Sequence, residues 1–115
     1  MAAEYQSAYI NLALHGFVVL AYDPIGQGER RQYWNPNTKE TEVGGPTTEH
    51  SMVGHLLFLL GEDLTHYRVW DGMRAIDYLE TRKEVDPKRI GCAGHSGGGT
   101  LTRFIAAVDE RVQCA

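Results

Sequence analysis

A single serine within a run of glycines is the part of this sequence best suited to chemistry. The residues Gly94-His95-Ser96-Gly97-Gly98 fit the G-x-S-x-G pattern, in which a sharp turn between a strand and a helix exposes a nucleophilic hydroxyl. We therefore expect Ser96 in a strained backbone conformation, with glycines removing the side chains that would collide across the turn. The start of the next helix directs the Gly97 N–H at the site, where it can receive a developing oxyanion. The pattern predicts acyl transfer, with Ser96 as nucleophile and Gly97 as oxyanion donor.

The rest of the catalytic machinery is absent from the sequence. A serine nucleophile needs a histidine base and an acid that orients it, and in this architecture both follow the serine. Residues 97–115 contain Asp109 and Glu110 but no histidine. We therefore expect these 115 residues alone to be inactive.

None of the five histidines of the chain is expected to act as the general base for Ser96. His95 adjoins Ser96 on a tight turn, so its ring is expected to pack beside the nucleophile instead of acting as its base. The other four precede the serine, and none joins a cysteine or carboxylate cluster with metal-ligand spacing. We expect neither a metal ion nor a cofactor. These four are His15, His50, His55 and His66.

Composition limits the remaining functions. A chain of 115 residues is at most one small domain, and its net charge of −4 gives no reason to expect nucleic acid as a partner. The longest apolar run, residues 56–60, is too short to span a bilayer. Cys92 and Cys114 are expected to be buried free thiols. The first residues lack the features of a signal peptide, and the compartment stays unknown.

The hydrophobic pattern alternates between helices and strands, which is typical of an α/β fold with a parallel sheet. A continuous β-branched and aromatic run over 17–22 predicts a strand buried on both faces. Residues 29–50 are expected to form a long polar loop. The pattern predicts helices over 3–14, 51–60, 64–82 and 98–108, and further strands over 89–93 and 111–115.

With these elements placed, the chain resembles the α/β-hydrolase superfamily, and within it the acetyl xylan esterase-like and dienelactone hydrolase-like branch. The resemblance rests on three segments and the serine motif, in this order and spacing. It implies a partial three-layer α/β-hydrolase fold in which residues 1–115 are the central part of one domain. The three segments are Tyr22 to Arg30, Trp70 to Leu79 and Val85 to Gly91.

The resemblance also implies what is missing. The second oxyanion donor belongs to a loop before residue 3, and the acid and histidine belong to loops after later strands. In the strand order of this family another strand lies between 17–22 and 89–93. We therefore expect exposed strand edges, through which the chain can self-associate.

By resemblance the substrate is a small-molecule or carbohydrate ester, with an acetylated carbohydrate favoured. Tyr33 and Trp34 on the long loop are candidates for substrate contact. A peptidase or a lactone hydrolase of the same superfamily remains an alternative. Two alternatives from other classes also remain: a non-catalytic fragment or interaction module, and a phosphate- or nucleotide-binding module that uses the glycine-rich turn as a cradle. The latter lacks the lysine of a phosphate loop. Other polar or aromatic residues are interpreted as structural, namely Asp23, Trp70, Asp71, Asp109 and Glu110.

Overall fold

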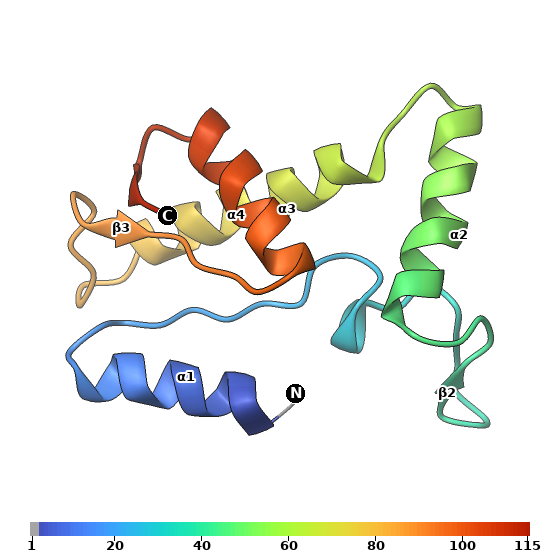
Figure 1. Cartoon of the computed structure of the whole chain (residues 1–115), viewed down its shortest axis with the longest axis horizontal. Helices are drawn as coiled ribbons and strands as arrows, with labels where there is room; N and C mark the ends of the chain where they lie inside the picture. Colours follow the sequence, from blue (N-terminus) through green and yellow to red (C-terminus); the bar gives the residue numbers. More distant parts are fainter. Residues whose placement is uncertain (1–2) are drawn as a thin grey trace. The chain divides into compact units, whose positions relative to one another are not determined.

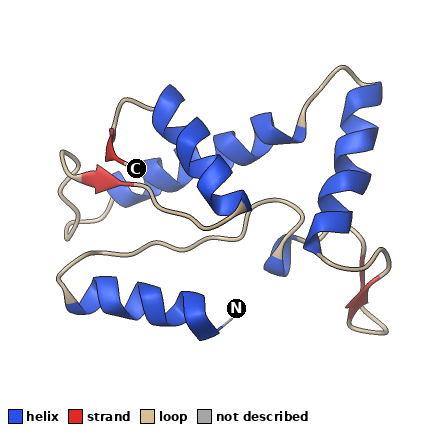
Figure 2. Ribbon diagram, viewed as in Figure 1, coloured by secondary structure: helices blue, strands red, loops and turns tan. Residues whose placement is uncertain are grey.

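The computed structural model describes residues 3–115, with side chains from residue 5 onward. The chain divides into two compact units: the Ser96 unit, made of the chain up to residue 22 and residues 73–115, and the loop unit, residues 23–72. Figure 1 labels the elements and Figure 2 colours them by type. They are α1 (Ala3–Leu14), η1 (Gly28–Arg30), β1 (Trp34–Asn35), β2 (Glu40–Thr41), α2 (Pro46–Leu59), α3 (Leu64–Glu80), β3 (Ile90–Gly91), α4 (Gly97–Val108) and β4 (Val112–Cys114).

The Ser96 unit contains a short parallel sheet with a helical crossover. Ile90 of β3 lies opposite Val112 of β4, and α4 connects the two strands, because parallel strands cannot be joined by a tight turn. Ile90 is buried together with Ile76 of α3 and with Leu101 and Ile105 on one face of α4. The mixed α/β class is thus confirmed, and so are the helices predicted over 3–14, 64–82 and 98–108, each to within two residues.

The strand predicted over 17–22 does not form, and this is a correction to the sequence interpretation. These residues are extended but pair with no strand among the residues described, and Figure 1 draws them in light blue without an arrow. The side chain of Phe17 is 62% exposed and that of Val18 is 48% exposed. A strand needs a neighbouring strand to bond its backbone groups, and among the described residues no strand pairs with this segment. Self-association through this edge stays a prediction.

Arg111 fixes the end of α4 to α3 inside the Ser96 unit. Its guanidinium donates to Asp109 at 2.6 and 2.8 Å, and to Asp77 and Glu80 at 2.7 Å each. These bonds raise the pKa of Arg111, and the bonds from Arg111 hold the pKa of Asp109 below its ordinary value although Asp109 is buried. The contacts support the structural interpretation of Asp109.

The two cysteines are free, and only one of them is partly buried. Cys92 lies with its Sγ 3.7 Å from the Thr102 hydroxyl, whereas Cys114 is exposed. The prediction that both thiols are buried is therefore wrong for Cys114. The reason is that β4 has one strand neighbour, β3, among the residues described.

None of the helices described between residues 3 and 115 is long and apolar enough to cross a membrane.

The loop unit is more ordered than the polar sequence over 29–50 predicts. It contains η1 and an antiparallel hairpin in which Trp34 of β1 lies opposite Thr41 of β2. The Asn35 side chain accepts the backbone N–H of Asn37 at 2.9 Å and so stabilises the hairpin turn. The helix expected from residue 51 begins at Pro46, because proline without an N–H suits the first helical position.

A buried carboxylate joins this hairpin to α2. The side chain of Glu49, in the first turn of α2, is 0% exposed. It accepts the Gln32 N–H at 2.8 Å and the Thr41 hydroxyl at 2.7 Å. Burial acts to raise the pKa of Glu49, but these bonds, a further bond from the Tyr33 backbone and the nearby Arg31 charge outweigh it and lower the pKa. The charged form is therefore the one that holds the hairpin.

Glu49→Gln is expected to destabilise the loop unit by about 1–3 kcal/mol, because an amide cannot accept both bonds that the carboxylate accepts. The parent also loses this contribution at low pH. Since the pKa of Glu49 is lowered on folding from 4.5, the stabilisation is complete above pH 4.5 and fades as the pH falls through the lowered value. Amide exchange at Gln32, measured against pH, reports this locally. The exposed Glu40→Gln is the control, and equal exchange in both variants would contradict the assignment.

Candidate active site

The predicted strain at Ser96 is present. Its φ is 54° and its ψ is −116°, and it occupies the position immediately before α4. A positive φ in a residue with a side chain costs on the order of 1–3 kcal/mol and persists only where the surroundings impose it. Ser96 is exposed, and its side chain makes no capping bond to α4. The Ser96 turn, residues 94–98, therefore presents this side chain to solvent.

Gly94 is the position in the Ser96 turn where a side chain cannot fit. A Cβ at Gly94 would lie 2.3 Å from the Gly98 carbonyl carbon and 2.4 Å from its oxygen, both backbone atoms that cannot turn aside. A Cβ at Gly97 or Gly98 would meet nothing within 4 Å. The expected crowding across the turn is thus confirmed for Gly94, whereas Gly98 contributes through its backbone.

The first turn of α4 leaves a backbone donor available beside Ser96. The Gly98 N–H donates to the His95 carbonyl at 2.9 Å, and the Thr100 N–H donates to the Ser96 carbonyl at 3.1 Å. No acceptor among residues 3–115 takes the Gly97 N–H. Because a helix N-terminus carries partial positive charge, this position favours an anionic oxygen.

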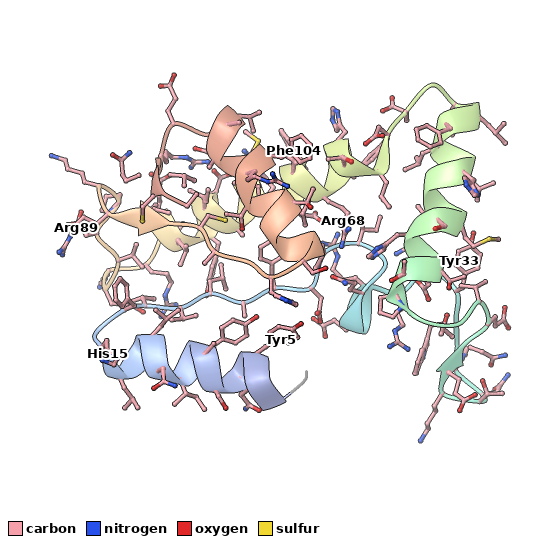
Figure 3. All side chains as sticks on the ribbon, in the orientation of Figure 1. Tyr5, His15, Tyr33, Arg68, Arg89 and Phe104 are labelled. Carbon is pink, nitrogen blue, oxygen red and sulfur yellow. The ribbon has the colours of Figure 1, made fainter. Side chains whose placement is uncertain are left out.

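His95 makes a contact that the sequence did not predict. Its Nδ1 lies 3.0 Å from the hydroxyl of Tyr5, which Figure 3 labels on α1, and the two ring centroids are 5.8 Å apart. The ring thus packs beside the Ser96 turn and is held by a residue from the start of the chain. The sequence could not have predicted this pair, because the two residues are 90 positions apart and no motif contains both of them.

Tyr33 and Trp34 belong to the loop unit, whereas Ser96 belongs to the other unit. Trp34 is 45% exposed, and the Arg31 guanidinium lies 5.6 Å from the centre of its ring. Figure 3 labels Tyr33, whose backbone carbonyl accepts the Glu42 N–H at 2.8 Å. Their contact with substrate stays a prediction.

The acidic residues of the loop unit are engaged in local structure. Asp23 accepts the Glu29 N–H at 3.4 Å, and a Cβ at Gly28 would collide with the Asp23 carboxylate. Asp71 accepts two bonds from Arg30, at 2.5 and 3.2 Å. These contacts support the structural interpretation of Asp23 and Asp71. Within residues 3–115 no group of three or more histidine, cysteine or acidic side chains is arranged to hold a metal ion.

Comparisons with known proteins identify the family of the chain. The family model for acetyl xylan esterase matches residues 1–115. The chain is also 32% identical over 98 residues to "Putative hydrolase YtaP" of Bacillus subtilis (strain 168), a match that covers 85% of this chain and 28% of that protein. No solved structure matches the chain significantly. Because the family model spans every residue, the chain belongs to the acetyl xylan esterase family.

Proposed function

We propose that this chain is the nucleophile-bearing part of a serine ester hydrolase, with Ser96 as the attacking residue. The observation that carries the proposal is the backbone of Ser96, held at a φ of 54° between β3 and the first turn of α4. Strain of this kind concentrates at functional sites. Membership of the acetyl xylan esterase family supplies the class of chemistry, hydrolysis.

In the proposed reaction the Ser96 Oγ bonds to the ester carbonyl carbon while its proton passes to a general base. The Gly97 N–H stabilises the negative charge that develops on the carbonyl oxygen. Collapse of this intermediate breaks the ester C–O bond, and the leaving alkoxide takes the proton from the base. Water then attacks the acyl-enzyme with the same proton relay, which releases the acid and restores Ser96.

The base is proposed to come from outside these residues. The histidine next to Ser96 is bonded to Tyr5, and residues 97–115 contain no histidine. The chain spans 28% of the length of its Bacillus subtilis relative. We therefore expect the 115 residues alone to lack esterase activity and the complete polypeptide to have it.

The substrate is proposed to be an acetylated carbohydrate, on the strength of the family match. Trp34 offers an exposed aromatic face that a sugar ring can stack against, and Tyr33 adjoins it in sequence. These two residues are the proposed contacts in the loop unit. Hydrolysis of acetylated xylan oligomers compared with simple acetate esters tests this part.

Covalent labelling tests the assignment of Ser96 directly. The chain is built into the Bacillus subtilis relative in place of the matching segment, and folding of the chimera is verified by cooperative unfolding. A fluorophosphonate is then added: the serine Oγ forms a bond to phosphorus, the P–F bond breaks and fluoride leaves. Peptide mass spectrometry is expected to find the label on Ser96.

Two variants of the chimera make this labelling decisive. Ser96→Ala is expected to remove the label. Ser51→Ala is expected to retain it, because the Ser51 hydroxyl bonds the Thr47 carbonyl on the exposed side of α2. A folded chimera that is labelled equally with and without Ser96 would overturn the proposal.

A further inference from the structure

Tyr5 and His95 form a pair that the proposed hydrolysis does not use. The Tyr5 hydroxyl lies 3.0 Å from His95 Nδ1, a normal hydrogen-bond distance. The backbone of His95 is held as well, since its carbonyl accepts the Gly98 N–H at 2.9 Å. Both the ring and the backbone of the residue before Ser96 are therefore fixed, and the ring is fixed by α1.

The chemistry of the two rings indicates which one donates. A neutral imidazole has one nitrogen that donates and one that accepts. The phenol O–H is far more acidic than the N–H of neutral imidazole, so the stronger bond has Tyr5 donating to Nδ1. His95 then carries its hydrogen on Nε2, and its single acceptor nitrogen is occupied.

We propose that Tyr5 is a positioning residue that holds His95 as the Nε2–H tautomer, and that His95 donates this N–H to the ester bound at Ser96. This contact with the ester is proposed because His95 is exposed and immediately precedes Ser96 in the Ser96 turn. Occupied at Nδ1 and protonated at Nε2, the ring has no lone pair with which to act as the base. The role toward the ester rests on the proposed function, whereas the tautomer does not.

NMR of the ring nitrogens in the chain itself tests the tautomer. Nε2 is expected to be protonated and Nδ1 unprotonated but hydrogen-bonded, and Tyr5→Phe is expected to move the Nδ1 signal. The folding equilibrium constant of Tyr5→Phe should fall about fivefold, as expected for one lost hydrogen bond. Tyr9→Phe, one helical turn along α1, is the control and should change neither signal. A proton found on His95 Nδ1 would overturn the proposed Nε2–H tautomer.

Two substitutions of His95 separate the contact with Tyr5 from the contact with the ester. Asparagine places an amide near the position of Nδ1 and can still accept from Tyr5, whereas glutamine places an amide N–H near the position of Nε2. In the chimera, His95→Asn is expected to raise KM about threefold to tenfold with little change in kcat, because it removes a hydrogen bond to the bound ester. His95→Gln is expected to raise KM less than His95→Asn does, and to lose stability because it cannot accept the bond from Tyr5.

The outcomes remain distinguishable from a failure of the proposed function. Equal KM values for the parent, His95→Asn and His95→Gln would overturn the role of His95 toward the ester. Ester hydrolysis that persists in Ser96→Ala would overturn the proposed nucleophile instead. The NMR result requires no activity and therefore decides the His95 tautomer in either case.

Discussion

Ser96→Ala is expected to reduce kcat for ester hydrolysis about 10⁶-fold in the chimera, the loss found when a serine nucleophile is removed from an intact site. The physical reason is that Ser96 carries the only hydroxyl within residues 94–98, beside the Gly97 N–H that is proposed to stabilise the developing charge. The measurement is the steady-state rate with an acetate ester, compared with Ser51→Ala. A loss below about tenfold would contradict the assignment of Ser96.

The same position separates activity from stability. Ser96→Gly removes the proposed nucleophile and also the Cβ that makes a φ of 54° costly. We expect Ser96→Gly to be as inactive as Ser96→Ala but more stable than it by about 1 kcal/mol. Urea denaturation of both variants checks this. Equal stability would show that the turn is not strained in solution.

Gly94→Ala is expected to have the largest effect on structure. Its Cβ would lie 2.3 Å from the carbonyl carbon of Gly98, which cannot move without displacing the first turn of α4. We expect a loss of about 3 kcal/mol or more in the free energy of unfolding, as for other strain imposed at a special backbone position. The shifted turn should also lose the fluorophosphonate label.

Gly98→Ala is the matched control for this clash. It adds the same methyl group at the last residue of the Ser96 turn, but into open space and in the first turn of a helix. Since alanine favours helix over glycine by about 1 kcal/mol, its stability should be equal or higher. Equal destabilisation by both substitutions would contradict the one-sided crowding at Gly94.

Local signals predicted the Ser96 turn and α4, because a glycine-crowded turn followed by an amphipathic run determines its own conformation. The segment over 17–22 was predicted incorrectly, because a strand depends on a neighbour and its apolar composition cannot say whether one is present. The hairpin of β1 and β2 was missed as well. The hairpin is held by the buried carboxylate of Glu49. Nothing in the sequence marked Glu49 for this role except its position three residues after Pro46.

The contact between α1 and the Ser96 turn has a consequence for the order of folding. The turn itself can form from residues 90–100, but Tyr5 and His95 are separated by 90 residues. Closing a loop of that length costs about 2 kcal/mol more chain entropy than closing one of ten residues. During synthesis from the N-terminus, α1 emerges long before its partner does. The ring beside Ser96 is therefore fixed late, after β3 and α4 have already set the backbone on which it stands.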